Sequence, residues 1–185
     1  MKPRIQPRPT PYPDSIKTIL AGYPQGPEGP IRLFRTLAHS ERALKKIGSA
    51  GLLDKGSPLS MKHREIIILR TSVNLGTDYE WGIHVQAFSN HVGLTAEQLG
   101  DSCNQSPTPG LWHEEEIILL RVVDSLTISA TIDDELWSSV TAEFSVEQVM
   151  EIIMLVGFYH TIAFLNNAMR VEQEDGTPRI GTVHA

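Results

Sequence analysis

An acidic and a basic side chain stand four residues apart in the segment YEWGIH, which runs from Tyr79 to His84. On a helix, Glu80 and His84 would lie one above the other on the same face. Such a pair serves as a surface ion pair, as half of a metal site or as a proton-transfer couple. Positions 79, 81, 83, 85 and 88 are all apolar or aromatic, so little of this helix is expected to face water. This pattern argues against a plain surface ion pair.

A second carboxylate, Glu65, begins the apolar run EIIIL. A buried charge is costly unless it is paired, and His84 is the obvious partner if the two helices pack as a hairpin. A carboxylate bonded to one imidazole nitrogen fixes the tautomer and leaves the other nitrogen to move a proton. An unperturbed histidine titrates near pH ~6.5, which suits general acid–base work.

A metal site is the main alternative for these three side chains. Glu65, Glu80 and His84 are all residue types that ligate divalent ions. The segment HEEEI, however, lacks the second histidine of an HExxH motif, and no second ligand cluster is apparent. No metal is therefore predicted. For His160, a core histidine satisfied by hydrogen bonding competes with a role in substrate contact.

The elements that must position these residues are predicted to be helices. Apolar residues recur at three- and four-residue steps, and no segment shows convincing strand alternation. Ser60 is expected to cap a helix that stops at Gly76, and Asp78 one that ends at Gly93. Three later helices are expected over residues 112–129, 133–144 and 145–171, the second of them capped by Asp133 or its neighbour. Capping boxes are predicted where the spacing fits, at Thr95 with Gln98 and at Ser145 with Gln148. The fold class is all-α, a compact helical bundle.

The sequence contains an internal repeat, in which two short motifs each occur twice. REIIILR at 64–70 matches EEIILLR at 115–121, and HVQAFSN at 84–90 matches HTIAFLN at 160–166. The order is the same in both halves, which indicates a duplicated helical hairpin.

Composition narrows the class of partner. The chain has 185 residues, 41% of them hydrophobic, and a net charge of −6. The negative charge and the lack of a basic cluster argue against nucleic acid. The single cysteine, Cys103, forms no internal disulfide and is compatible with a cytoplasmic location. The longest apolar run, Ile152–Tyr159, is too short for a membrane span.

Three regions are expected along the chain. Residues 1–30 are rich in proline and are expected to form an extended arm. Residues 31–172 form the helical domain. Residues 173–185 are polar and are expected to form a loose tail.

The stretch from LSMKHREIIILRTSVNLGTDYEWGIHVQAF through GLTAEQL, residues 59–99, resembles the carboxymuconolactone decarboxylase family. The wider superfamily includes alkylhydroperoxidase D-type enzymes, which have a Glu, then CxxC, then a His. In this alignment Glu65 and His84 take the Glu and His positions, and Thr77 and Glu80 stand where the cysteines would be. Peroxide reduction by a dithiol is thereby excluded.

The resemblance implies an alkylhydroperoxidase D-like subunit, chemistry without a cofactor and a ring-shaped homo-oligomer, commonly a trimer or hexamer. It favours a decarboxylase-type lyase or an isomerase acting on a small unsaturated acid, lactone or polyketide-like compound. We expect His84 to move the proton, Glu80 to assist or orient it, and Glu65 to set its tautomer. Substrate contact is expected from three further residues, Tyr79, Trp81 and His160. The alternative is a non-catalytic helical scaffold that retains the fold.

Overall fold

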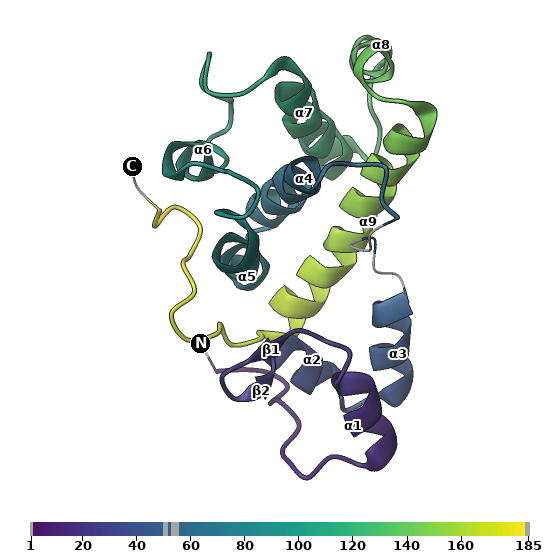
Figure 1. Cartoon of the computed structure of the whole chain (residues 1–185), viewed down its shortest axis with the longest axis vertical. Coiled ribbons are helices and arrows are strands. Elements are labelled where there is room, and N and C mark those ends of the chain that lie inside the picture. The colour runs from purple at the N-terminus through teal and green to yellow at the C-terminus, as the bar shows by residue number, and fades with distance from the viewer. Residues whose placement is uncertain (1, 50–51, 53–55, 184–185) are drawn as a thin grey trace.

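The computed structural model describes residues 2–49, 52 and 56–183, and in these residues the chain folds as a bundle of helices (Figure 1). Residue 1 of the expected arm, residues 50–51 and 53–55 of the expected domain and residues 184–185 of the expected tail lie outside the described part. The elements are α1 Asp14–Leu20, β1 Gln25–Gly26, β2 Gly29–Pro30, α2 Arg32–Leu37, α3 Glu41–Ser49, α4 Met61–Asn74, α5 Asp78–Phe88, α6 Ala96–Asp101, α7 Glu114–Ser129, α8 Asp134–Glu143 and α9 Val146–Met169.

The all-α class is confirmed, with one short exception. β1 and β2 form a two-residue antiparallel pair in which Gln25 faces Pro30. Gly29 takes a φ of 101°, a left-handed conformation that glycine adopts at no steric cost. The hairpin is too short to show any alternation of polar and apolar residues, so the sequence pattern gave no strand signal.

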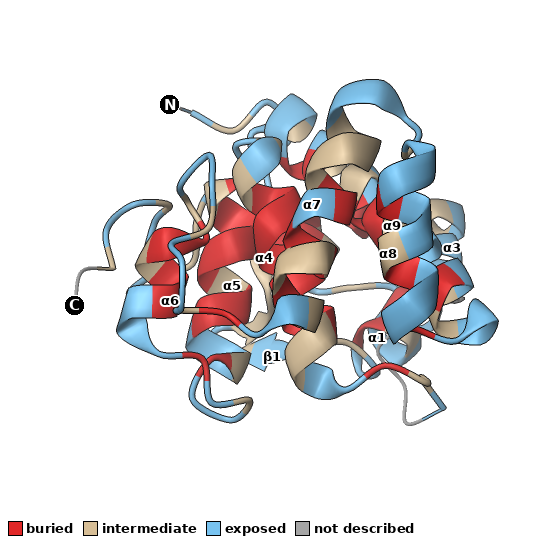
Figure 2. Ribbon diagram, turned by 90° about the horizontal axis from the view of Figure 1, so that it is seen from above, coloured by how far each residue is buried: buried red, intermediate tan, exposed pale blue. Residues whose placement is uncertain are grey.

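α4 is the central helix of the bundle. It packs against α5, α7 and α9, and its residues from Arg64 to Ser72 are all buried (Figure 2). A helix surrounded on all sides has no water-facing stripe. Its polar side chains must therefore find partners inside the protein, and this requirement places Glu65 at the candidate site.

Most of the expected helix caps are present. Side-chain oxygens of Ser60 and Asp133 accept from the backbone N–H three residues later, and both predicted capping boxes form. The expected cap at Asp78 is wrong. Thr77 precedes α5, and the Asp78 carboxylate instead accepts from the backbone N–H of Ile180 at 3.0 Å. α5 also ends at Phe88 rather than at Gly93, because the chain turns there into the loop before α6.

Residues 14–49, here called the N-terminal lobe, pack as a unit in which α3 contacts both α1 and α2. The Tyr23 and Phe34 rings stack with centroids 4.0 Å apart. In Figure 1 this lobe lies at one end of the molecule, below α5 and beside the C-terminal half of α9. Its inner face thereby lies opposite α5, the helix that carries Glu80 and His84.

The segment after α9, expected to be a loose tail, joins this lobe to α5. The Glu174 carboxylate accepts from the Tyr79 hydroxyl at 2.9 Å and from the backbone N–H of Arg32. The Tyr79 oxygen in turn accepts from the backbone N–H of Leu33 at 2.9 Å. A Cβ on Gly82 would collide with the Pro178 carbonyl oxygen, so the tail runs close against α5. Tyr79 therefore connects α5, the first turn of α2 and the tail.

One described helix, α9, is long and apolar enough by length and composition to cross a membrane. The core helix of a globular protein passes the same test. α9 packs against α4, α5, α7 and α8, and 39% of the candidate span is buried inside the protein.

Replacing Tyr79 with phenylalanine tests the joint between the lobe and the bundle. The Tyr79→Phe variant leaves the buried N–H of Leu33 without its acceptor. We expect the free energy of unfolding to fall by about 1–3 kcal/mol. Tyr12→Phe is the matched control, since the Tyr12 hydroxyl has no hydrogen bond within the described residues, and it should change stability by less than about 0.5 kcal/mol. Urea unfolding of both variants measures the difference. Equal decreases in the free energy of unfolding would show that the hydrogen bonds of Tyr79 contribute nothing to stability.

Candidate active site

The core of the site is the imidazole ring of His84, which lies between two carboxylates. Its Nδ1 is 2.8 Å from Glu65 Oε2, and its Nε2 is 3.3 Å from Glu80 Oε1. Glu65 comes from α4, while Glu80 and His84 lie one turn apart on α5. All three are buried, with exposures of 3%, 8% and 4%. The structure therefore brings together the three residues that the sequence singled out.

Two residues of α9 complete the polar cluster. The Tyr159 hydroxyl is 3.2 Å from His84 Nε2, and the Asn166 side-chain amide donates to Glu80 Oε2 at 3.0 Å. Asn166 thereby holds one oxygen of Glu80, so that the other faces His84. Tyr159 and Asn166 are seven residues apart and lie on the same face of α9.

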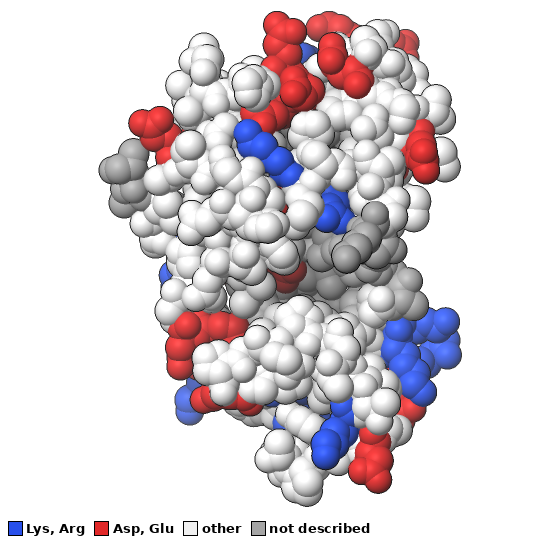
Figure 3. Space-filling view, in the orientation of Figure 1, with Lys and Arg blue, Asp and Glu red and all other residues white. Residues whose placement is uncertain are grey.

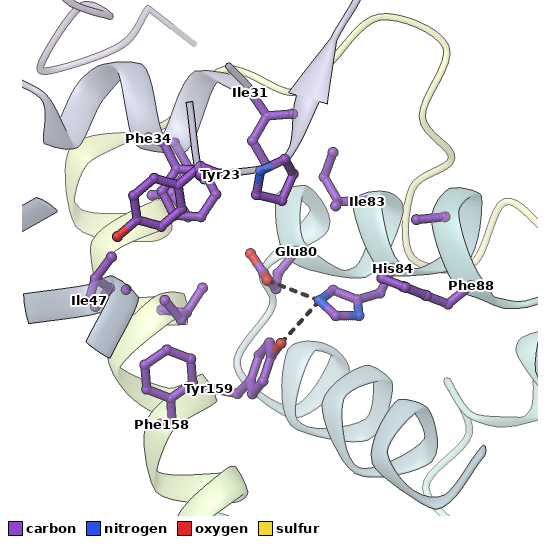
Figure 4. A pocket seen from close by; sticks show the side chains of 16 residues that line it. Tyr23, Ile31, Phe34, Ile47, Glu80, Ile83, His84, Phe88, Phe158 and Tyr159 are labelled. Carbon is purple, nitrogen blue, oxygen red and sulfur yellow. Dashed lines mark hydrogen bonds and ion pairs between the residues drawn. The ribbon is translucent and has the colours of Figure 1, made fainter. Parts of the chain in front are cut away.

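This cluster opens into a cavity of about 390 Å³ (Figure 4). Glu80, His84 and Tyr159 point into the cavity from one side, and the N-terminal lobe closes the other with Tyr23, Phe34 and Ile47. The remaining wall is apolar or backbone. It is formed by Gly22, Pro24, Ile31, Leu33, Gly48, Ile83, Ala87, Phe88, Phe158 and Ile162. The volume is within the range of small-molecule sites in proteins.

The outer surface in this region is mostly uncharged. Figure 3 shows a hollow between the part of the molecule that contains the N-terminal lobe and the rest, and the surface around it is largely white. Acidic and basic side chains appear on both parts of this face, and a few of them lie close to the hollow.

The two carboxylates set the protonation of His84. Burial by itself would lower the pKa of the imidazole, but the charge of Glu65, its hydrogen bond and the hydrogen bond and charge of Glu80 outweigh burial and raise the pKa to about 10. The ring is therefore an imidazolium at neutral pH, with both N–H groups donating. Nδ1–H donates to Glu65, and Nε2–H is directed at Glu80 and the Tyr159 oxygen.

Tyr159 remains a neutral phenol. Burial, followed by the charges of Glu80 and Glu65, raises the pKa of its hydroxyl well above the usual value. Since the hydroxyl oxygen accepts from the imidazolium, its own hydrogen is left for an acceptor in the cavity. The site therefore holds a carboxylate base, an imidazolium acid and a phenol donor within one polar cluster.

The three residues that were expected to contact the substrate do not line this cavity. Tyr79 bonds to the tail and to α2, as described above. Trp81 is fully buried in the core on α5. The Nδ1–H of His160 donates to the Val156 carbonyl oxygen at 2.8 Å, within its own helix. Their contact with a substrate stays a prediction, and the bond of His160 within its own helix agrees with the alternative of a core histidine satisfied by hydrogen bonding.

The second copy of the motif builds no equivalent site. Glu116, the counterpart of Glu65, is buried and lies 2.6 Å from the Lys62 ammonium. Its carboxylate also accepts from the backbone N–H of His113 at 3.0 Å. Because Glu116 and His160 each have another partner, the acid–histidine pair forms only in the first copy.

Sequence reasoning missed Tyr159, Asn166 and the wall from the N-terminal lobe. A signal was present for the first two, because a phenol and an amide seven residues apart interrupt one face of an otherwise apolar helix. The wall had no such signal, since Tyr23, Phe34 and Ile47 are ordinary core residue types.

Neither a metal cluster nor a thiol marks the cavity within the described residues. No group of three or more histidine, cysteine, aspartate or glutamate side chains is arranged to hold a metal ion. Cys103 lies on the loop after α6, where its thiol contacts the Leu99 carbonyl oxygen at 3.6 Å. It is not among the residues that line the cavity.

Comparison with known proteins connects this site to a family. Residues 39–123 match the carboxymuconolactone decarboxylase family. The matched range includes α4 and α5 with Glu65, Glu80 and His84, and it ends before α9. No curated protein matches the chain in sequence.

Solved structures share the fold. A protein of unknown function from Agrobacterium tumefaciens, described as a candidate antioxidant defence protein AhpD, is 25% identical; the match covers 74% of this chain and 93% of that one, with a TM-score of 0.67. An uncharacterised peroxidase-related protein from Silicibacter sp. TM1040 is 18% identical, covering 91% and 90%, with a TM-score of 0.74. The debrominase Bmp8 is 15% identical, covering 88% and 87%, with a TM-score of 0.73. These likenesses establish an alkylhydroperoxidase D-like fold.

The raised pKa of His84 predicts a specific dependence of stability on pH. The folded-state pKa of about 10 lies above the unfolded value of about 6.5. The imidazolium therefore adds stability that is fully present below about pH 6.5 and is lost as the pH rises toward about 10. NMR of labelled histidine should show the His84 ring protonated at pH 8.

The matched variants are His84→Gln and His91→Gln, of which His91 is exposed. In urea unfolding, His84→Gln should remove part of the loss of stability between pH 6.5 and 10, and His91→Gln should leave it unchanged. A His84 ring that titrates near pH 6.5 would contradict this assignment.

Proposed function

We propose that this protein, whose residues 39–123 match the carboxymuconolactone decarboxylase family, is an enzyme that moves protons at a carbon next to a carbonyl group. It would act as a decarboxylase-type lyase or as an isomerase on a small unsaturated acid, lactone or polyketide-like compound. The family and the shared fold, which includes a debrominase, indicate catalytic activity of some kind. That the chemistry needs no cofactor is part of the proposal and rests on the family resemblance.

One observation carries the proposal. A buried imidazolium lies between two carboxylates, and its Nε2–H edge faces an apolar cavity. Removing three ionised groups from water is expensive, and a scaffold gains nothing from doing so beside an open cavity. Shifted acid–base groups in a cleft are typical of catalytic sites.

For an isomerisation, the carboxylate of Glu80 takes a proton from the carbon next to the carbonyl. The electron pair of that C–H bond moves to the carbonyl oxygen and forms an enolate, which accepts a hydrogen bond from the Tyr159 hydroxyl. The Nε2–H of His84 then delivers a proton to another carbon. The proton on Glu80 passes to Nε2 over the 3.3 Å between them and restores the resting state.

For a decarboxylation, the bond between carbon and the leaving carboxylate breaks and CO₂ departs. The electron pair forms the same enolate, and His84 Nε2–H protonates the carbon. The imidazole then regains a proton from water. Both reactions use His84 as the acid, and both benefit from the apolar wall, which strengthens each electrostatic contact by excluding water.

Thiol peroxidase chemistry has no counterpart in this site. Relatives in fold are described as AhpD or peroxidase-related, yet Thr77 and Glu80 stand where a dithiol would be, and Cys103 lies outside the cavity wall. We therefore propose proton transfer rather than peroxide reduction for this chain, in a cytoplasmic setting.

His84→Ala tests the assigned acid. Removal of a general acid–base group costs about 10²–10⁴-fold in rate, so turnover should fall by at least about 100-fold while circular dichroism stays unchanged. The assay follows CO₂ release or solvent deuterium entering carbon, over a panel of enolisable acids, lactones and ketones. Two controls, His91→Ala and Cys103→Ser, should retain wild-type turnover. Near-wild-type turnover by a folded His84→Ala protein would contradict the assignment of His84 as the acid. The Glu80–His84 pair would then have a structural role.

We also propose that α9 forms an interface between copies of this chain. Exposed apolar side chains run along one face of this helix, with Met150 at 60% and Phe164 at 61% exposure. From Ile153 to Phe164 the exposed positions carry no charge. An exposed apolar face is typical of an interface between protein chains, and this one carries no like charges that would oppose a second copy. A ring-shaped trimer or hexamer remains the assembly implied by the family resemblance.

Met154→Glu tests this interface, because it places a charge at its centre. Sedimentation of the wild type should show an oligomer, and the variant should shift toward the 20.5 kDa monomer. Ala96→Glu, which places the same charge at an exposed position on α6, should leave the assembly intact. A monomeric wild type at micromolar concentration would overturn the proposal.

A further inference from the structure

We infer that the cavity selects an uncharged, flat carbonyl compound and discriminates against carboxylates. This inference rests on the proposed function and narrows it. Of the two reactions above, the proton shuttle within a neutral ketone or lactone then fits the site, and loss of CO₂ from an anionic substrate does not.

The wall favours a flat, apolar ligand. Four aromatic side chains other than Tyr159 line the cavity, which are Tyr23, Phe34, Phe88 and Phe158. Tyr23 and Phe34 stack on each other in the wall opposite His84 (Figure 4). Aromatic faces pack well against planar ligands, and isoleucine side chains at 31, 47, 83 and 162 add to the apolar lining. A ring of aromatic size therefore has apolar contacts on several sides.

The charge at the wall opposes an anion. Glu80 is the one anionic side chain in the lining, and no lysine or arginine lines the cavity in the described part of the chain. Both nitrogens of His84 already have acidic partners. Arg64 lies near enough to influence the pKa of Tyr159, but its guanidinium donates to the Leu52 carbonyl oxygen and is not part of the wall. A ligand carboxylate would therefore face the Glu80 carboxylate in a poorly solvated space, where like charges repel strongly.

A neutral carbonyl oxygen, by contrast, can accept a hydrogen bond from the Tyr159 hydroxyl. The hydrogen bond of the Tyr159 hydroxyl within the described residues is to His84 Nε2. With the imidazolium as donor, the phenol hydrogen is available to the carbonyl. The Glu80 oxygen that faces His84 then lies on the same side of the cavity as this donor. A neutral carbonyl compound can therefore meet a hydrogen-bond donor and a base together, without bringing a second negative charge.

A neutral methyl ester and the corresponding carboxylate, which share the same aromatic ketone, test the inference. Methyl 4-acetylbenzoate is a flat neutral ketone, and 4-acetylbenzoate is the corresponding anion. At pH 7.5, calorimetry should give the ester a dissociation constant at least about tenfold lower than that of the acid. In Glu80→Gln the anion should bind more tightly than to the wild type, so that the ratio shrinks. Glu97→Gln removes one exposed charge on α6 and should leave the ratio unchanged. Tyr159→Phe should weaken the binding of both ketones.

The outcomes separate this inference from the proposed function. Equal or tighter binding of the acid, a ratio that Glu80→Gln does not change, or no binding of either ligand at millimolar concentration would each overturn the selectivity. Deuterium entering the acetyl methyl group is measured separately. Selective binding without exchange would support the selectivity and count against the proton-transfer function. Deuterium exchange together with tighter binding of the acid would support the proton-transfer function and count against the selectivity.

Discussion

The site depends on one electrostatic arrangement, an imidazolium held between two carboxylates in the protein interior. Each of the three ions would be costly to bury alone. Together they satisfy one another, since Glu65 fixes Nδ1 and Glu80 faces Nε2. The central position of α4 makes this pairing necessary, because Glu65 has no route to water from a helix that is buried on every side. The position of α5 follows, because His84 must approach Glu65.

How much of this could be predicted from sequence depends on the range of the interaction. Glu80 and His84 are one helical turn apart, so their meeting requires only that the segment be a helix. Glu65 was predictable because a charge in an apolar run needs a partner and one histidine was within reach of a hairpin. Caps at Ser60 and Asp133 were also local, and they are present. The cap expected at Asp78 was wrong because a distant segment, at Ile180, takes that carboxylate.

The unpredicted half of the site comes from long-range packing. Tyr159 meets His84 across 75 residues and Asn166 meets Glu80 across 86. No local pattern fixes which face of α9 turns toward α5. The same limit explains the second copy of the motif. His160 matches His84 in sequence, yet Glu116, the counterpart of Glu65, pairs with Lys62, and His160 bonds within its own helix. A repeated pattern therefore did not give a repeated site.

The polar cluster and the cavity wall come from different parts of the chain. The family-matched range, 39–123, supplies Glu65, Glu80 and His84, which set the acid–base character. The phenol donor and the amide that orients Glu80 come from α9, and most of the wall facing them comes from residues 22–34, all outside that range. The tail fixes this wall in place, since Glu174 and Tyr79 tie α2 to the helix that carries His84. A substitution in the wall changes which ligand fits without touching the three ions. The shape of the cavity wall opposite His84 therefore comes mainly from residues that the family match does not include, whereas the negative charge at the wall comes from Glu80, which the match includes.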